Sequence, residues 1–172
     1  MSIAASRPPL AASVSVVTRS TDETRALAAE LALVARAGDR LALLGPLGAG
    51  KTQFAKGFAR GLGVTEIVNS PSFTLMAEYT GRLPVFHQDL YRLAGAEEAI
   101  AGGLIDERQL GGVTLSEWAE RLPVEIDPRR VTVSIEVLGD DERRITITPA
   151  AEDQFRYSAA AQAWLRDAEA AS

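Results

Sequence analysis

A glycine-rich loop between an apolar run and a helical segment is the feature that most restricts what this chain can fold into. Four apolar residues, Leu41 to Leu44, lead into the segment GPLGAGKT at 45–52, which fits the pattern G-x-x-x-x-G-K-[ST]. A short apolar run that ends at glycine is typical of a buried strand. Beyond the loop, Phe54, Phe58 and Leu62 recur at helical spacing, so the sequence predicts strand, loop and helix in that order.

This order is the one that a phosphate-binding loop needs. Glycines let the backbone approach phosphate oxygens without a Cβ in the way, and successive N–H groups at a helix N-terminus hold the anion. The alternative, an accidental glycine-rich coil, does not explain the flanking strand and helix. The segment 45–52, called the glycine loop below, therefore predicts nucleotide binding by Gly45, Leu47, Gly48, Ala49, Gly50, Lys51, Thr52 and Gln53.

The lysine of the glycine loop stands out against the rest of the chain. The chain has sixteen arginines and two lysines, Lys51 and Lys56. A compact ammonium on a flexible stem fits between β- and γ-phosphates, whereas a planar guanidinium does not. We therefore expect Lys51 to be catalytic, while Lys56 is consistent with a solvated helix position.

Composition excludes several classes of function. The length of 172 residues suggests one domain, expected over 13–172 after a disordered tail at 1–12. The net charge of −5 advertises no general surface for nucleic acid. The absence of cysteine and the single histidine rule out disulfides, cysteine metal sites and multi-histidine metal sites. No apolar run approaches the ~20 residues that span a membrane, so a cytoplasmic protein is expected.

The remaining pattern mixes strands with helices, which favours a three-layer α/β domain with a mainly parallel sheet. Ser20 and Glu23 form a capping box before a helix that is expected to run to about Ala37. A final helix is expected over Ala150–Ala170, with Phe155, Ala159, Ala163 and Trp164 facing inward. Strands are expected at Val14–Thr18, after a Ser-Pro turn in Val68–Tyr79, at Leu83–Leu93 and at Val113–Leu115, a short helix at Ala96–Ala101, and a hairpin at Val131–Val137 and Arg144–Thr148.

Two acids lie at predicted strand ends, where a nucleotide-bound Mg²⁺ needs oxygen ligands beside the Thr52 hydroxyl. Asp89 ends the apolar run Leu83–Phe86, although a carboxylate that only caps a strand end is the alternative. Glu117 follows Val113–Leu115 and either binds the metal or orients the attacking water, unless it is a solvated residue at a helix start. His87 shares a predicted strand face with Asp89. Two roles stay open for it: to orient Asp89 or a switch segment, or to serve a purely structural purpose.

Four segments, GPLGAGKT, NSPSFTL, HQDLYRL and SEWAERL, occur in an order and at a spacing that resemble the TsaE family, formerly YjeE. The family comprises small P-loop ATPases of tRNA threonylcarbamoyladenosine biosynthesis. The resemblance covers roughly Thr18 to Leu122 and continues more weakly through the hairpin. It departs from the family pattern at Phe73, where tyrosine is common, at Gln88 and at Ala119.

The resemblance implies a P-loop NTPase-like fold that binds ATP and Mg²⁺. It implies Thr52 and Glu117 at the metal and Asp89 as the Walker-B-like acid. It also implies a switch segment, residues 70–75, near the γ-phosphate. The segment contains Ser70, Pro71 and Thr74, and adenine is expected near Asp22 and Arg143.

The resemblance further implies slow ATP hydrolysis that resets a modification complex of TsaD-like and TsaB-like partners between turnovers. Transfer to the adenosine next to the anticodon would belong to those partners, so tRNA is met only indirectly. Trp118 is either a core residue or part of the surface that reports the γ-phosphate to a partner.

Two other functions stay open on the residues alone. A small-molecule kinase uses the same loop and would need an arginine-bearing lid, for which Arg92, Arg108 and Arg121 are the candidates. A non-catalytic nucleotide switch would signal by binding alone, against which Asp89 and Glu117 argue.

Overall fold

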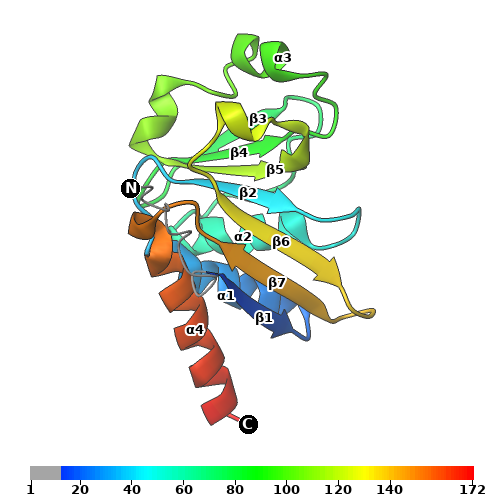
Figure 1. Ribbon diagram of the computed structural model, residues 1–172, viewed down its shortest axis with the longest axis vertical. Helices are drawn as coiled ribbons and strands as arrows, with labels where there is room; N and C mark the ends of the chain where they lie inside the picture. Colours follow the sequence, from blue (N-terminus) through cyan, green and yellow to red (C-terminus); the bar gives the residue numbers. More distant parts are fainter. Residues whose placement is uncertain (1–12) are drawn as a thin grey trace, which may run out of the picture.

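One seven-stranded mixed sheet organises the protein, whose computed structural model describes residues 13–172 (Figure 1). The predicted tail at 1–12 lies outside these residues. The strand order is β1-β7-β6-β2-β5-β4-β3. The strands are β1 (Val14–Thr18), β2 (Arg40–Leu44), β3 (Met76–Tyr79), β4 (Val85–Asp89), β5 (Val113–Glu117), β6 (Val131–Val137) and β7 (Arg143–Thr148).

The centre of the sheet is parallel and its edges are antiparallel. Strands β6, β2, β5 and β4 run parallel to one another. Strand β3 pairs antiparallel with β4, and β7 pairs antiparallel with both β6 and β1. The predicted α/β fold with a mainly parallel centre, a C-terminal hairpin and a final helix is therefore confirmed.

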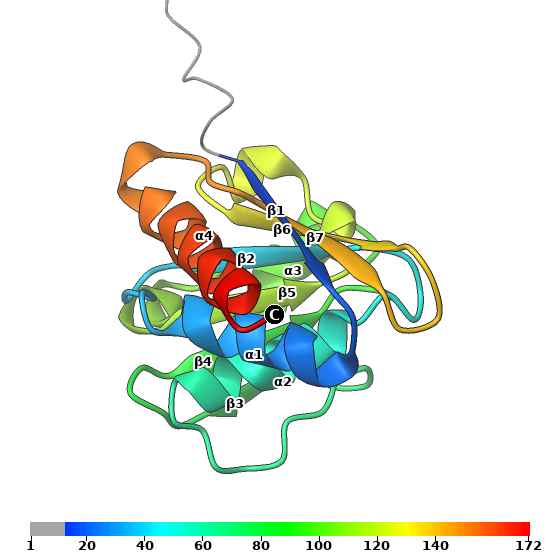
Figure 2. The ribbon, with the colours of Figure 1, turned by 90° about the horizontal axis from the view of Figure 1, so that it is seen from below.

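Four α-helices accompany the sheet in the described part of the chain. They are α1 (Thr21–Ala32), α2 (Lys51–Gly61), α3 (Ala96–Ala101) and α4 (Phe155–Ala170). Helices α1 and α2 pack on each other, and α4 lies against α1 and β1 (Figure 2). Their apolar side chains, among them Leu27, Phe54 and Phe58, join one face of the sheet in the main core. Between residues 13 and 172, no helix is long and apolar enough to cross a membrane.

The second face of the sheet is covered only in part. A smaller apolar cluster, which includes a residue of α3, packs on this face at β4 and β5. It consists of Leu90, Leu93, Ala99, Leu104 and Leu122. Polar residues follow on the outer face of the β1–β7–β6 portion, where hydroxyl pairs such as Ser15 with Thr146 lie at the surface. The fold therefore has three layers at β4 and β5 and two layers at the hairpin.

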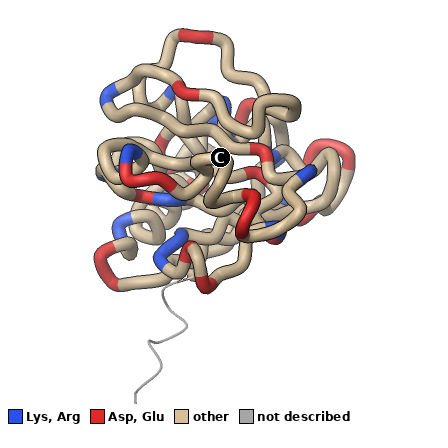
Figure 3. Tube along the Cα trace, turned by 90° about the horizontal axis from the view of Figure 1, so that it is seen from above, with Lys and Arg blue, Asp and Glu red and all other residues tan. Residues whose placement is uncertain are grey.

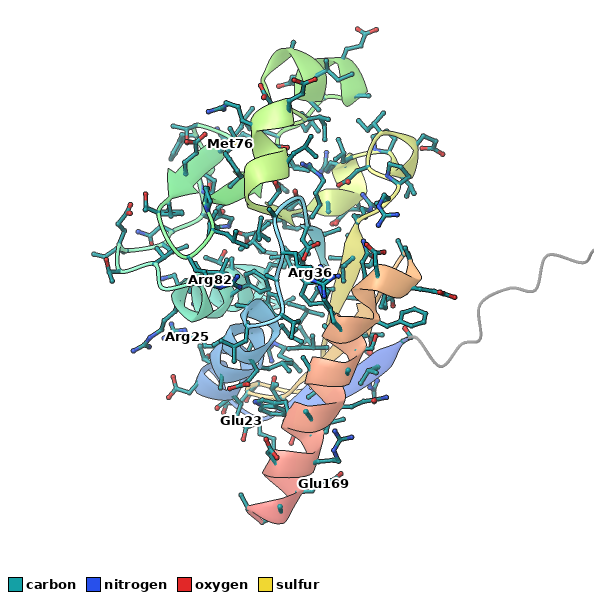
Figure 4. The ribbon with its side chains drawn as sticks, turned by 90° about the vertical axis from the view of Figure 1, so that its left-hand side faces the viewer. Glu23, Arg25, Arg36, Met76, Arg82 and Glu169 are labelled. Atoms are coloured by element: carbon teal, nitrogen blue, oxygen red, sulfur yellow. The ribbon has the colours of Figure 1, made fainter. Side chains whose placement is uncertain are left out.

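The first helix begins as predicted but ends about five residues early. The Ser20 Oγ accepts a hydrogen bond from the Glu23 N–H at 3.0 Å, while the Glu23 carboxylate accepts from the Arg19 N–H at 2.6 Å instead of the Ser20 N–H. At the other end, the guanidinium of Arg82, labelled in Figure 4, donates to the Ala32 and Ala35 carbonyls. A side chain from a distant segment therefore satisfies carbonyls that a longer helix would have used.

The strands near the acids also differ from the predicted spans. Strand β4 ends at Asp89 and not at the predicted Leu93, and Tyr91, beyond its end, is half exposed. Strand β5 runs through Glu117, which is its last residue and not the start of a helical turn. Hydrogen-bonded pairing with neighbours extends β5 beyond its apolar run.

The predicted inward face of the last helix is confirmed only at Trp164, which packs against the main core. Tyr157, Ser158 and Ala161 are its buried residues, whereas Ala159 is exposed and Phe155 is half-buried. An alanine-rich helix carries little apolar contrast between its faces, and a polar contact orients it instead. The Tyr157 hydroxyl donates to Asp39 Oδ2 at 2.5 Å, and Arg156 donates to the same oxygen. Burial raises the pKa of Tyr157 well above its usual range.

This contact predicts a stability cost for Tyr157→Phe. The variant keeps the packing and removes a hydroxyl that donates to a charged acceptor, so we expect the free energy of unfolding to fall by about 2 kcal/mol. Urea unfolding at neutral pH measures it. Tyr79→Phe, which removes a hydroxyl from a half-buried tyrosine, controls for the chemical change. Equal unfolding midpoints for the two variants would mean that the Asp39 contact does not anchor α4.

Candidate functional site

The glycine loop joins the end of β2 to the start of α2, as predicted. An added Cβ at Gly45 would lie 2.7 Å from the Ile135 carbonyl oxygen of β6, so only glycine fits this close approach. Gly48 and Gly50 have φ angles of 78° and 108°, in the left-handed region. Left-handed residues within such a turn direct successive N–H groups to one side, which creates an anion-binding concavity.

The Lys51 ammonium lies across its own loop. Its Nζ donates to the carbonyls of Gly45 at 2.5 Å and Pro46 at 3.0 Å, and sits 3.8 Å from the centroid of the Trp118 ring. Burial lowers the pKa of Lys51, while the charges of nearby acids, first Glu120 and then Glu117, oppose that shift. Its partners are uncharged carbonyls and a ring face, which a negatively charged phosphate oxygen can replace.

A chain of hydrogen bonds connects the loop to the neighbouring strands. The Thr52 hydroxyl donates to Glu117 Oε1 at 2.7 Å, and His87 Nε2 lies 2.5 Å from Glu117 Oε2. Glu117 and His87 are both buried. His87 thus orients Glu117 and not Asp89, which corrects the prediction. His87 Nδ1 has no hydrogen-bond partner, so the imidazole takes part in this series of hydrogen bonds through Nε2 alone.

The second acid links the sheet to the switch segment. Asp89 is the last residue of β4 and lies beside Glu117 in the parallel register. Its Oδ2 accepts from the hydroxyls of Ser70 at 2.6 Å and Ser72 at 3.4 Å, and its Oδ1 accepts from the Tyr91 N–H. The two acids predicted at strand ends are therefore neighbours at the carboxyl edge of the sheet.

These residues surround a cavity of about 380 Å³. Its lining is Leu47, Gly48, Ala49, Gly50, Lys51, Thr52, Gln53, Ser70, Ser72, Asp89, Glu117 and Trp118. A smaller hollow of about 110 Å³ adjoins it along the loop. Its lining is Ser20, Thr21, Thr24, Gly48, Ala49, Gly50, Gln53, Asp140, Asp141 and Arg143.

Most, but not all, of the predicted site residues meet here. Asp22 is exposed on the first turn of α1, and neighbouring hydroxyl residues line the hollow instead. Pro71 and Thr74 shape the switch segment through backbone contacts and do not line either cavity. Arg143 does line the smaller hollow, but its guanidinium donates hydrogen bonds to carbonyls of the glycine loop.

Sequence reasoning missed several residues that line the two hollows, among them Ser72, Thr24 and the pair Asp140 and Asp141. The only signal for Ser72 was its place two residues after Ser70 in a Ser-Pro-Ser run. The acidic pair appeared in the sequence as an ordinary hairpin turn, and only the pairing of β6 with β7 and β2 brings that turn to the loop.

The oxygen donors in the larger cavity suit a hard cation. They are the Thr52 hydroxyl and the carboxylates of Asp89 and Glu117, and Mg²⁺ prefers such ligands. Across residues 13–172, no group of three His, Cys, Asp or Glu side chains is arranged to hold a metal ion. A Mg²⁺ ion here would therefore depend on phosphate oxygens and water for its other ligands.

The arginines considered for a kinase lid have other contacts. Arg108 pairs with Glu78 at 2.8 Å, on the exposed surface near β3. The guanidiniums of Arg92 and Arg121 lie over the rings of Phe73 and Tyr91 respectively. None of the three lines the cavity at the glycine loop.

Comparison with known proteins gives consistent matches. The family model described as threonylcarbamoyl adenosine biosynthesis protein TsaE matches residues 18–145. The chain is 48% identical over 129 residues to the Bacillus subtilis protein of that name, covering 74% of this chain and 80% of that protein. It is 41% identical over 131 residues to the Treponema pallidum protein, covering 76% of this chain and 97% of that protein.

A solved structure agrees with these matches. The crystal structure of YdiB from Bacillus subtilis superposes with a TM-score of 0.66 at 41% sequence identity. The match covers 90% of this chain and 95% of that one.

The buried contact between His87 and Glu117 predicts energetic coupling. His87→Leu removes the donor to a buried carboxylate, so we expect the free energy of unfolding to fall by about 2 kcal/mol. In a double-mutant cycle, His87→Leu and Glu117→Gln should couple by about 1 kcal/mol or more, because the two side chains are in contact. Ser70→Ala, which acts on Asp89, serves as the control partner. Additive effects of His87→Leu and Glu117→Gln would contradict the contact.

Proposed function

The chain belongs to the TsaE family and acts in tRNA threonylcarbamoyladenosine biosynthesis, and we propose that it does so by binding ATP with Mg²⁺ and hydrolysing it slowly. The observation that carries this proposal is the position of Glu117, 2.7 Å from the hydroxyl of Thr52 on the glycine loop. A carboxylate that already contacts the loop threonine can share with it the binding of the Mg²⁺ ion of a nucleoside triphosphate.

In this proposal, N–H groups of the glycine loop and of the first turn of α2 bind the polyphosphate. Lys51 exchanges its carbonyl and ring contacts for the β- and γ-phosphate oxygens. Thr52, Asp89 and Glu117 would hold a Mg²⁺ ion, which would neutralise charge on the phosphates. Asp89 also contacts Ser70, so the switch segment responds to what occupies the γ-phosphate position.

The smaller hollow is the place for the nucleoside. It lies beside the glycine loop and is lined by the hydroxyl residues Ser20, Thr21 and Thr24 and by the acids Asp140 and Asp141. These groups can accept and donate hydrogen bonds to a ribose and a base. A volume of about 110 Å³ leaves part of the nucleoside exposed to solvent.

The partners in this proposal are TsaD-like and TsaB-like proteins, which hold the tRNA. Lysine and arginine positions are interspersed with acidic ones in the view of Figure 3, so direct binding of tRNA is not part of the proposal. Leu47 of the glycine loop and Phe73 of the switch segment are each 87% exposed. A partner that covers these apolar side chains would complete the hydrolytic site, in the cytoplasm, where tRNA is modified.

The proposal predicts that Lys51→Ala abolishes ATP hydrolysis and weakens ATP binding, because no other cation lines the cavity among the described residues. Steady-state phosphate release and calorimetric titration with Mg-ATP measure the two effects. Lys56→Ala, the other lysine on α2, is the matched control and should behave like the wild type. Undiminished hydrolysis in Lys51→Ala would remove the proposed site.

A second test concerns the partners. Without them, hydrolysis should take on the order of minutes per turnover or longer, as unassisted switches of the P-loop class do. Adding TsaD-like and TsaB-like proteins from the same source, with tRNA, should raise the rate of phosphate release. Lys51→Ala should fail to support repeated rounds of tRNA modification. Equal rates with and without partners, or repeated rounds without hydrolysis, would contradict the proposal.

A further inference from the structure

Arg143 makes an unusual set of contacts at the start of β7. Its Nε donates to the Ala49 carbonyl at 2.9 Å, and its Nη2 donates to the Gly48 carbonyl at 3.3 Å. Its Nη1 donates to carbonyls of the hairpin turn, at Gly139, Asp140 and Glu142. One guanidinium therefore joins the glycine loop to a turn more than ninety residues away in the sequence.

The hairpin touches the glycine loop at a second place. The carbonyl of Ile135 on β6 packs so closely against Gly45 that a Cβ there would lie 2.7 Å from it. Strand β6 thus supports the first residue of the loop, and Arg143 of β7 supports its middle. These two contacts are independent of each other, and both come from the β6–β7 hairpin.

We infer that Arg143 is a positioning residue of the glycine loop. By holding the Gly48 and Ala49 carbonyls, it keeps the loop in a conformation in which N–H groups such as that of Gly50, which shares a peptide plane with the Ala49 carbonyl, bind polyphosphate. The Ala49 N–H itself donates to the Pro46 carbonyl at 3.0 Å. A peptide plane that presents its N–H to one side presents its C=O to the other. A donor on the carbonyl side therefore stabilises the anion-binding orientation. The identity of the ligand rests on the proposed function, whereas the effect on the loop does not.

The geometry of the guanidinium explains why arginine is present. Its planar fork directs Nε and Nη2 to adjacent carbonyls of the loop while Nη1 faces the turn. A lysine ammonium is a single point donor and cannot reach both segments in this arrangement. The role also differs from a base contact, because all three nitrogens of Arg143 already donate to backbone carbonyls.

The test compares Arg143→Met with Arg144→Met. Arg144 is the next residue on β7, is exposed, and pairs with Glu136 at 2.9 Å, so it is a matched control. Calorimetric titration uses two probes, Mg-ATP and inorganic tripolyphosphate. Loss of two hydrogen bonds to the loop should weaken both by about tenfold, and by similar factors, in Arg143→Met. Arg144→Met should bind both like the wild type.

The outcomes separate positioning from base recognition. If Arg143→Met loses affinity for ATP but keeps its affinity for tripolyphosphate, Arg143 acts on the nucleoside and the inference is overturned. Unchanged affinity for both probes overturns it as well. Arg143→Lys keeps the charge and tests the fork, so restored binding in that variant would also contradict the inference.

Amide hydrogen exchange in the protein without nucleotide gives a second measurement. The amides of residues 47–52 should exchange faster in Arg143→Met and Arg143→Lys, and at the wild-type rate in Arg144→Met. Unchanged exchange in both Arg143 variants would overturn the inference. If the wild type binds neither probe, the proposed function fails, and the exchange experiment still decides whether Arg143 positions the loop. If Arg143→Met does not fold, Arg143→Lys carries both measurements.

Discussion

A loop that binds an anion through its backbone must keep N–H groups free of partners inside the folded protein, and the structure around the cavity meets that constraint. Folded proteins usually satisfy their backbone groups internally, so such a loop collapses unless something else holds it. Here side chains bind the carbonyls of the loop, while among its N–H groups that of Ala49 is satisfied within the loop by the Pro46 carbonyl, at 3.0 Å. Lys51 takes those of Gly45 and Pro46, and Arg143 takes those of Gly48 and Ala49.

The same constraint explains which strands of the sheet carry the acids and which support the loop. The parallel strands β2, β5 and β4 end at one edge, so the loop, Glu117 and Asp89 meet there without long side chains. The antiparallel hairpin β6–β7 supports the loop from the other side, through Ile135 and Arg143. Each functional group is thus positioned by an element whose own stability comes from the core.

Each of the two acids is held by its own set of hydrogen bonds. Glu117 is held by Thr52 and His87, and Asp89 is held by Ser70 and Ser72. Glu117 is therefore connected to α2 and β4, whereas Asp89 is connected to the switch segment. Leu75, at the end of that segment, has a φ of 65°, a strained value for a non-glycine residue. Strain next to the proposed nucleotide site is consistent with a segment that has two arrangements.

The sequence by itself determined the loop, its strand and helix, and the strand-end places of Asp89 and Glu117, because these depend on local periodicity and on glycine chemistry. The α/β fold with its C-terminal hairpin followed from the order of the same patterns. Only the tertiary structure decided that His87 contacts Glu117, that Arg82 ends α1 early, and that Asp39 turns α4 onto its Tyr157 face. It also decided that the Arg143 guanidinium donates to the loop carbonyls. Each of these is a polar contact between residues at least 30 apart, for which local pattern carries no signal, since the partner is set by strand order and register.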